Sequence, residues 1–440
     1  MTSEFLAGGR IHPALHIDER GVVVGRVTDA GHYHLVTDRG QVFDPEALRG
    51  VLALMPRPYP DLAGRWPDED AGAFVADGEA PSFSEVLARL IRALGEAVEF
   101  HRPEQAALVA TWAVASYFHP LFLTFPRLAL AGEKGSGKSK ILTVLQATAF
   151  NALLMLMPTS AVVYRLIREF RPSLLLDEME GLGRDDARNL LAIINSGYRT
   201  GGTVPRCEGA EGRRVESFSV YAPLALAAIK SVNGVTEDRC IPLVLQHGTD
   251  RRRINAEIDP GHPCFARIRS GCYRLLLGRW EAVRDAYLTR ELPEWLTARA
   301  RQLWRPLLAV AACADDLALV PDLLALAREH VADRDDLSAE GEALLAVLAE
   351  HLGAAPAVTV RPGALAGGLR RRLGRPQPPT AEQVSAWLRR LGLRRSGKDR
   401  EGARYEIHAE QLRAMTARYT PEATVTPSPS LSNSLIYQAK

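Results

Sequence analysis

A glycine-rich turn between a short apolar stretch and a helix constrains this chain more than any other feature. Residues 128–131 are apolar, residues 132–139 read Gly-Glu-Lys-Gly-Ser-Gly-Lys-Ser, and Lys140 is followed by Ile-Leu-Thr-Val-Leu. The turn fits G-x-x-x-x-G-K-[ST], the phosphate-binding loop of nucleoside triphosphatases. Because a strand precedes it and a helix follows it, the pattern favours this function over the alternative of a coincidental Gly/Ser loop.

Each residue type in this loop has a chemical reason. Glycines allow backbone N–H groups to turn toward phosphates, and the helix N-terminus adds its positive dipole end. Lys138 is expected to bridge the β- and γ-phosphates of ATP, and the Ser139 hydroxyl is expected to bind Mg²⁺. The predicted nucleotide-binding residues are Gly132, Glu133, Lys134, Gly135, Ser136, Gly137, Lys138 and Ser139.

The composition is that of a soluble globular protein. The chain has 440 residues, 47% of them hydrophobic and 24% charged, with a net charge of +2. This allows about three domains and excludes an overall polyelectrolyte. No apolar run reaches membrane-spanning length, and the N-terminus lacks the features of a signal peptide. Scattered cysteines indicate reduced thiols, with half a zinc site at His262, Cys264 and Cys272 as the alternative, so we expect a cytoplasmic protein without a membrane partner.

A pair of carboxylates follows a second apolar stretch. Residues 174–176 are leucines, and Asp177 and Glu178 come directly after them, 38 residues beyond Ser139. Open α/β sheets bind ligands at the carboxyl ends of their strands. Asp177 is therefore predicted to bind the Mg²⁺ shell and Glu178 to orient and deprotonate the attacking water. The alternative is a pair of helix-capping carboxylates.

A hairpin is predicted between this strand and the next one. Residues 203–207 and 213–220 flank the sequence Glu-Gly-Ala-Glu-Gly, which indicates two strands joined by a turn with basic residues near its tip. The second strand runs into a long apolar stretch, residues 220–229, which we expect to be a core strand. A further strand is expected at residues 240–245.

Arg239 stands just before that last strand. Ring-forming ATPases keep an arginine in such a position to reach the γ-phosphate held by a neighbouring subunit. An arginine supplied in trans neutralises transition-state charge, so Arg239 is predicted to be catalytic across subunits. The alternative is an ion pair with Asp238 or Glu237 on a surface turn.

Hydrophobic spacing predicts the flanking elements. Helices are expected over residues 82–94, 104–118, 160–169 with Ser160 as N-cap, and 184–196 ending at Gly197. Residues 151–157 are expected to be buried. Short β-branched runs predict strands near the N-terminus, where four histidines suit a strand surface better than a metal site. The predicted domains are a β-rich module (1–55), a linker (56–82), an α/β P-loop core (83–254), a helical lid or collar (255–356), a winged helix (357–418) and a disordered tail (419–440).

The predicted winged helix has a basic surface. Residues 365–373 and 380–391 are expected to be helices, the second with Thr380 as N-cap, and two short strands should follow. Between residues 361 and 418 there are 14 Lys/Arg against 5 Asp/Glu, which is typical of a surface that binds a phosphate backbone. The alternative is that the module packs on a neighbouring subunit. The predicted DNA contacts are Arg389, Arg390, Arg394, Arg395, Lys398, Arg400 and Arg404.

Taken in order, these motifs resemble an uncharacterised P-loop ATPase family of phage, plasmid and mobile-element proteins that often occurs beside primases. The family is similar to superfamily 3 helicases and the wider AAA+ class. The motifs that carry the resemblance are residues 126–139, 174–178, 194–202, 221–223, 237–243 and 299–308.

The resemblance implies further site residues. In superfamily 3 helicases the hairpin before the fourth core strand points into the ring pore and grips DNA, which implies that role for Arg206, Arg213 and Arg214. Those helicases end the fourth strand with an asparagine that senses the γ-phosphate. This chain has Ile229 and Lys230 there, which leaves Lys230 as the substitute.

The sequence therefore predicts a ring-forming, ATP-hydrolysing DNA translocase or helicase of AAA+ type, with ATP and Mg²⁺ as cofactors. The resemblance implies a homo-oligomer, expected to be a hexameric ring, that acts in the replication of a phage, plasmid or other mobile element with a primase or another replication protein as partner. The alternative is a regulatory ATPase whose nucleotide state controls assembly with a partner in helicase loading, transposition or phage defence.

Overall fold

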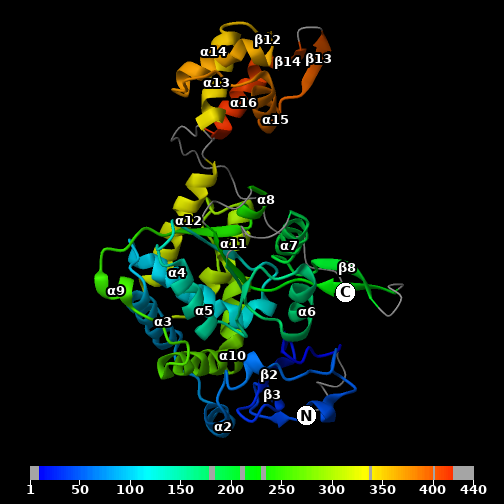
Figure 1. The fold of residues 1–440 in the computed structure, drawn as a ribbon, viewed down its shortest axis with the longest axis vertical. Helices are drawn as coiled ribbons and strands as arrows, with labels where there is room; N and C mark the ends of the chain where they lie inside the picture. The colour runs from blue at the N-terminus through cyan, green and yellow to red at the C-terminus, as the bar shows by residue number, and fades with distance from the viewer. Residues whose placement is uncertain are drawn as a thin grey trace. The chain divides into compact units, whose positions relative to one another are not determined.

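Two compact units, Met1–Val331 and Ala332–Lys440, make up the chain (Figure 1). The computed structural model describes residues 9–177, 184–208, 214–228, 234–335, 339–399 and 402–419. The first unit contains the predicted β-rich module, the predicted core and most of the helical region, so these segments are not separate bodies.

A five-stranded parallel sheet forms the centre of the first unit. Its order is β11 (Cys240–Val244), β5 (Arg127–Ala131), β10 (Leu224–Ala228), β7 (Leu174–Asp177) and β6 (Leu153–Leu156). Arg127, Leu224 and Leu174 lie in register at the start of three neighbouring strands. The carboxyl ends therefore share one edge, and this parallel sheet fits the predicted α/β core. The predicted strand at residues 220–229 is shorter than expected, because β10 begins only at Leu224.

Alternation along each strand places apolar side chains on both faces of the sheet. In β5, Leu128 and Leu130 belong to one buried cluster and Ala129 belongs to another. The first cluster includes residues of α3 (Phe83–Ala97), α4 (Pro103–Ala115), α5 (Lys138–Thr148), α10 (Pro263–Thr289) and α11 (Ala298–Ala311). The second includes residues of α6 (Ser160–Phe170), α7 (Arg184–Ser196), β8 (Thr203–Glu208) and β9 (Arg214–Ser219).

The helices around the sheet match the predictions closely, with two corrections. The helix predicted from Ser82 is confirmed as α3, and Ser82 caps it by accepting a hydrogen bond from the backbone N–H of Glu85. The N-cap of α6 is Thr159, so the prediction of Ser160 is wrong by one residue. Residues 151–157 are not all buried, since Leu156 and Met157 are 61% and 46% exposed. They lie at the end of β6, the edge strand, which has a neighbour on one side only.

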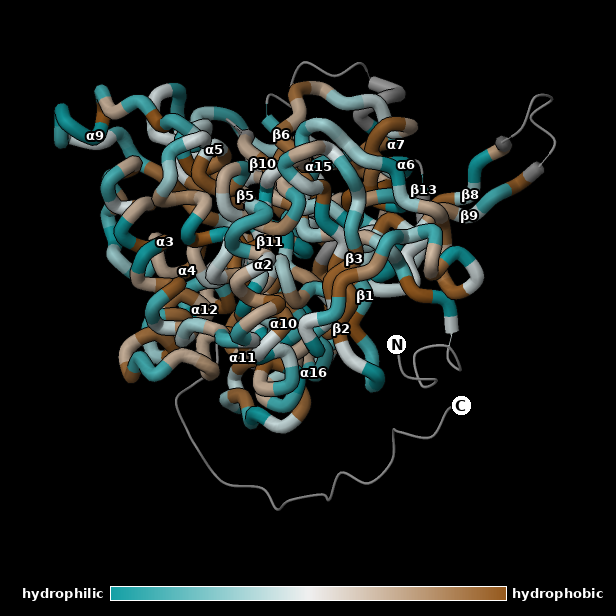
Figure 2. Tube along the Cα trace, turned by 90° about the horizontal axis from the view of Figure 1, so that it is seen from below, coloured by the Kyte–Doolittle hydropathy of each residue, from teal (hydrophilic) through white to brown (hydrophobic). Residues whose placement is uncertain are grey.

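The N-terminal module is an antiparallel four-stranded sheet. Its strands are β1 (Leu15–Asp18), β2 (Gly21–Val27), β3 (Tyr33–Thr37) and β4 (Val42–Phe43), followed by the 3₁₀ helix η1 (Pro45–Leu48). Hairpin turns that contain Gly31 and Gly40, with φ angles of 82° and 69°, join β2 to β3 and β3 to β4. Figure 2 shows β2 as mostly hydrophobic. Every residue of this strand is buried, including Arg26.

Residues 56–82 are not an open linker, in contrast to the prediction from their prolines and acidic residues. They contain the 3₁₀ helix η2 (Pro60–Leu62) and α2 (Asp68–Asp77). Trp66 is fully buried and stacks on Tyr273 of α10, with 4.9 Å between ring centroids. Phe74 is also buried. The segment therefore joins the N-terminal module to the core through a shared apolar cluster.

The predicted helical region follows β11. Within the first unit it contains α10, α11 and α12 (Leu319–Asp335). The short helices α8 (Gly234–Glu237) and α9 (Arg251–Asn255) lie before and after β11. Figure 2 shows α9 as hydrophilic, and none of its residues is buried. The 3₁₀ helix η3 (Ser116–Leu121) links α4 to the residues before β5.

The second unit has its own core. It contains α13 (Ala339–Leu352), β12 (Ala357–Val360), α14 (Pro362–Arg372), α15 (Ala381–Arg390), β13 (Arg395–Asp399), β14 (Gly402–His408) and α16 (Ala409–Tyr419). The three strands form one antiparallel sheet in the order β12, β14, β13. Thr380 caps α15 through a complete capping box with Gln383, as the sequence predicts. Because α13 packs in this core, the predicted boundary at residue 356 is wrong.

Two buried histidines help to hold the first unit together. His12 Nε2 lies 2.8 Å from the carbonyl oxygen of Arg168, and His119 Nδ1 lies 2.9 Å from that of Ser116. A carbonyl only accepts, so each ring nitrogen carries the proton and donates. Burial lowers the pKa of both rings from 6.5 to about 3, and both are therefore neutral at physiological pH.

These histidines predict a loss of stability in mild acid. Below pH 6.5 the unfolded chain takes up protons that the folded chain does not bind, so the free energy of unfolding falls with pH. We expect His12 and His119 together to contribute a loss of about 3 kcal/mol between pH 6.5 and pH 5. Urea denaturation at these pH values measures it, and a His12→Gln, His119→Gln double variant should show a clearly smaller loss. An equal loss in the double variant would contradict this assignment.

Candidate active site

The predicted phosphate-binding loop lies between β5 and α5, at the carboxyl edge of the sheet. Gly135 and Gly137 have φ angles of 86° and 97°, which favour glycine, and Gly137 is the N-cap of α5. A Cβ on Gly132 would lie 2.5 Å from the carbonyl oxygen of Leu245. The loop therefore keeps its shape because β11 and its continuation press against it, and side chains are excluded from these positions.

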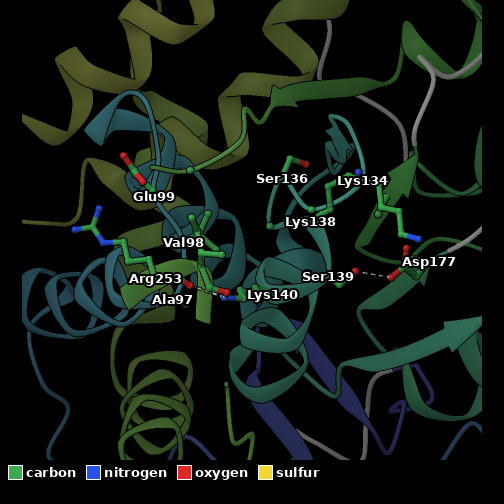
Figure 3. A pocket seen from close by; sticks show the side chains of 15 residues that line it. Ala97, Val98, Glu99, Lys134, Ser136, Lys138, Ser139, Lys140, Asp177 and Arg253 are labelled. Carbon is green, nitrogen blue, oxygen red and sulfur yellow. Dashed lines mark hydrogen bonds between the residues drawn. The ribbon is translucent and has the colours of Figure 1, made fainter. Parts of the chain in front are cut away.

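Lys138 and Ser139 are the first two residues of α5, and their side chains contact the glycine loop and Asp177, respectively. Lys138 Nζ donates to the carbonyl oxygens of Gly132 and Glu133 at 2.5 and 2.9 Å, so its ammonium group lies over the loop. The Ser139 hydroxyl donates to Asp177 Oδ2 at 3.2 Å (Figure 3). The structure thus brings together residues from β7 and α5 that are 38 positions apart in the sequence.

A cavity of about 620 Å³ runs along this loop. Its volume is within the range of small-molecule sites. Figure 3 shows the Ser139–Asp177 pair at one end and the side chains of Glu99 and Arg253 toward the other. The lining residues outside the loop are Ala97, Val98, Glu99, Lys140, Asp177, Ala227, Gly248, Arg253 and Ile254.

The far end of the cavity is built by segments that the sequence predictions did not name. Glu99, just after α3, accepts hydrogen bonds from the backbone N–H groups of Thr249 and Asp250 at 2.6 and 2.7 Å and from the Thr249 hydroxyl at 2.9 Å. These donors lower the pKa of the Glu99 carboxyl, the Asp250 N–H contributing most. Lys140 donates to the carbonyl oxygen of Ile254 at 2.9 Å, which ties α9 to α5.

Val98 connects this end of the cavity to the phosphate-binding loop. A Cβ on Gly137 would approach Val98 Cγ1 to 3.1 Å, so the two residues pack directly on each other. No motif marks Val98 or Glu99 in the sequence, because their contacts are with residues about 40 positions away for Val98 and 150 positions away for Glu99. The only local sign is that they follow directly on the end of α3.

Several predicted residues lie outside the described part of the chain. Glu178, the predicted base, follows Asp177 directly in the sequence but belongs to residues 178–183, and Lys230, the predicted γ-phosphate sensor, belongs to residues 229–233. Arg213 and Arg400 also lie outside it. Their roles stay predictions.

A buried arginine fixes the start of the phosphate-loop strand. Arg127 is 1% exposed, and its guanidinium donates to the carbonyl oxygens of Ile194, at 3.0 Å, and Ala222. Burial lowers the pKa of Arg127 to about 10, so it remains charged at neutral pH. A Cβ on Gly197 would lie 2.0 Å from the Val220 carbonyl oxygen, which gives a physical reason for glycine in the motif 194–202.

Arg239 lies at the amino-terminal ends of the strands, whereas the phosphate loop lies at their carboxyl ends. Its neighbour Cys240 pairs with Arg127 at the start of β5, whereas Gly132 follows the end of that strand. A five-residue strand is about 16 Å long, so Arg239 does not reach the loop of its own chain. The Arg239 guanidinium lies over the ring of Tyr198, 5.1 Å from its centroid. Asp238, the predicted alternative partner of Arg239, accepts a hydrogen bond from Arg299 at 3.0 Å.

The predicted hairpin is present as β8 and β9, paired from Thr203–Ser219 to Glu208–Arg214. It extends away from the body of the first unit in both views (Figures 1 and 2). The Arg206 guanidinium lies 5.5 Å from the centroid of the Tyr164 ring of α6. Arg206 is therefore within β8 and contacts the body of the unit, and does not lie at the tip of the hairpin as predicted. Arg214 is the first residue of β9.

In the second unit, the predicted DNA contacts that the structure describes fall on α15, on the connection after it and on the β13–β14 hairpin. Their described side chains are exposed, those of Arg389, Arg394, Arg395 and Arg404. Arg404 lies 3.6 Å from Asp399, which also pairs with Arg361 at 3.0 Å. Arg390 and Lys398 lie in α15 and β13, but their side chains are outside the description.

Among the residues described, no group of three or more histidine, cysteine or acidic side chains is arranged to hold a metal ion. None of the helices in the described ranges combines the length and apolar character needed to cross a bilayer.

No family model matches the sequence, and no curated protein matches it. Solved structures align with it at low identity. The SCCmec type IV active helicase Cch has 11% identity over 92% of this chain and 80% of its own, with a TM-score of 0.41. The JCV helicase has 13% identity over 63% and 77%, and Cdc6p from Pyrobaculum aerophilum has 12% over 73% and 93%, each with a TM-score of 0.23. The case for a function therefore rests on the pocket and its residues.

Proposed function

We propose that this chain is a ring-forming, ATP-hydrolysing DNA translocase or helicase of AAA+ type. The observation that carries the proposal is the pocket at the carboxyl edge of the sheet, where Lys138 lies over the glycine loop and the Ser139 hydroxyl meets Asp177. A phosphate loop, a lysine and a carboxylate at one sheet edge are what ATP hydrolysis requires. We place this activity in the replication of a phage, plasmid or other mobile element because of the family resemblance.

The residues of the pocket fit ATP and Mg²⁺. Side chains are excluded at Gly132, so the backbone there can approach phosphates closely. The hydroxyl of Ser139 and the carboxylate of Asp177 are oxygen ligands of the kind Mg²⁺ prefers. A Mg²⁺ ion held by them would supply positive charge that neutralises the charge developing on the phosphates.

The chain's own residues divide the remaining work. The Lys138 ammonium would exchange its loop carbonyls for β- and γ-phosphate oxygens. Glu178, adjacent to Asp177 in the sequence, would orient the attacking water and accept its proton. Val98 and Arg253 would contact the nucleoside end, and the Glu99 bonds to Thr249 and Asp250 would hold that end closed.

Arg239 would complete the site from a second subunit. Its place at the amino-terminal edge of the sheet excludes its own loop, and in a head-to-tail ring this edge would face the phosphate loop of a neighbouring subunit. A ring also gives the β8–β9 hairpin a central position, where Arg206, Arg213 and Arg214 would grip DNA. The second unit, which we interpret as a winged helix, would add backbone contacts through Arg389, Arg394 and Arg395.

One experiment tests the proposed function. The rate of ATP hydrolysis is measured with no DNA, with single-stranded DNA and with duplex DNA, while native mass is recorded for the same samples. We expect an oligomer and stimulation by DNA that weakens as salt rises, because phosphate contacts release counterions. An Arg389→Ala, Arg394→Ala double variant should need more DNA for half-maximal stimulation, with an unchanged rate in its absence.

The second candidate function is a regulatory ATPase that controls assembly with a partner. The large second unit, with a core of its own, favours it, because such a unit suits protein partners as well as DNA. An ATPase that forms oligomers but does not respond to any DNA would support this function instead of a translocase.

A further inference from the structure

Three of the motifs in the sequence meet at the sheet edge opposite the phosphate loop. Tyr198 follows α7, Asp238 and Arg239 lie between α8 and β11, and Arg299 stands in the first turn of α11. Figure 1 shows α7, α8 and α11 on the same side of the first unit. We call these four residues the Tyr198 cluster. The proposed site uses only Arg239 among them.

The contacts within the Tyr198 cluster centre on one aromatic ring. The guanidinium carbons of Arg239 and Arg299 lie 5.1 and 4.8 Å from the centroid of the Tyr198 ring. Arg299 also donates to the Tyr198 hydroxyl and, through Nε, to Asp238 Oδ2 at 3.0 Å. A further bond to Gln302 Oε1, at 2.7 Å, holds Arg299 to α11. Arg299 therefore holds the Tyr198 ring in place, and Arg299 is itself fixed by its hydrogen bonds to Asp238 and Gln302.

The backbone of Tyr198 is fixed as well. Its carbonyl oxygen accepts a hydrogen bond from the backbone N–H of Phe125 at 2.8 Å, close to the start of β5. Gly197, one residue earlier, packs against the Val220 backbone. Arg239 has a long flexible side chain, and a rigid ring beneath its guanidinium reduces the number of directions in which it can point. Two guanidinium groups on one ring also favour the approach of an anion.

We infer that Tyr198, braced by Arg299 and Asp238, is a positioning residue that directs Arg239 toward the nucleotide phosphates of the next subunit. The inference rests on the proposed function, because it requires a site shared between two chains. It also explains why the motifs at residues 194–202, 237–243 and 299–308 occur together, since each supplies one side of the cluster.

Subunit mixing tests this inference. Tyr198→Leu removes the ring and should lower kcat about 100-fold, the loss expected when a catalytic group is misplaced by about 1 Å, while ATP affinity stays unchanged. Mixing Tyr198→Leu with Glu178→Gln protein should restore hydrolysis, because intact pockets of the first then meet correctly directed arginines of the second. Tyr198→Phe keeps the ring and should lose at most about threefold. Trp295→Leu, which removes a similar ring beneath Arg328, 5.1 Å away, should have no effect.

A reference mixture separates this inference from the proposed function. Arg239→Ala mixed with Glu178→Gln should also regain activity, at about a quarter of the interfaces for random equal mixing in a ring. If the reference mixture regains activity and the Tyr198→Leu mixture does not, the inference is overturned and the shared site stands. If neither regains it, both are overturned. If Tyr198→Leu does not fold, Arg299→Ala replaces it, because this change keeps the Tyr198 ring and removes the residue that holds it. Mixing Arg299→Ala with Glu178→Gln protein must then restore hydrolysis in the same way.

Discussion

Lys138→Ala should reduce ATP hydrolysis to the background level. The ammonium group of Lys138, the first residue of α5, lies over the loop and donates to the carbonyl oxygens of Gly132 and Glu133. Its removal takes away the positive charge that the β- and γ-phosphates need, an interaction that is strengthened in the transition state. Steady-state hydrolysis and binding of a fluorescent ATP analogue measure the two parts of the effect.

The fold should survive this change. Lys138 makes two hydrogen bonds to carbonyls that solvent can replace, so we expect a loss of about 1 kcal/mol in the free energy of unfolding. Lys138→Arg keeps the charge but not the compact ammonium group, and it should remain strongly impaired. Hydrolysis by Lys138→Ala at the normal rate would exclude the proposed site.

Arg239→Ala should lower kcat by about 10³-fold or more while the affinity for ATP changes little. The reason is that Arg239 lies too far from its own loop to bind the nucleotide there. In the proposed ring it would act only when the phosphates held by a neighbouring subunit develop charge. The measurement compares kcat with the dissociation constant of ATP for the variant and the parent protein.

The chain offers a matched control for this arginine. Arg328 is an exposed arginine that also lies over an aromatic ring, that of Trp295, away from the sheet edge. Arg328→Ala should leave hydrolysis unchanged. Equal losses in Arg239→Ala and Arg328→Ala would point to a general effect of removing surface charge, and an unchanged kcat in Arg239→Ala would place the site within one subunit.

The centre of the site could be predicted from the sequence because its signals are local. The glycines, Lys138 and Ser139 lie within eight consecutive residues, and Asp177 ends an apolar run whose place 38 residues after Ser139 indicates a buried strand of the same sheet. In the structure the glycine loop and Asp177 line the same cavity, with 3.2 Å between the Ser139 hydroxyl and Asp177 Oδ2. The helices were predictable for the same reason, since their caps and periodicity lie within single segments.

The nucleoside end of the site and the role of residues 56–82 could not be predicted. Val98 and Glu99 matter because they pack on Gly137 and bond to the loop after β11, and nothing in their own sequence indicates those partners. Prolines and acidic residues suggested a linker, but Trp66 is covered by Tyr273, about 200 positions away in the sequence. Long-range packing of this kind decides burial and leaves no local pattern.

The central claim is that one chain holds only half of a working ATPase site. The most direct measurement is the hydrolysis rate per chain over a dilution series, with native mass recorded at each concentration. We predict that the rate per chain rises and falls with the assembled fraction, because Arg239 reaches the phosphates only across an interface. A sample that is fully monomeric by mass and hydrolyses ATP at the undiminished rate would contradict the claim.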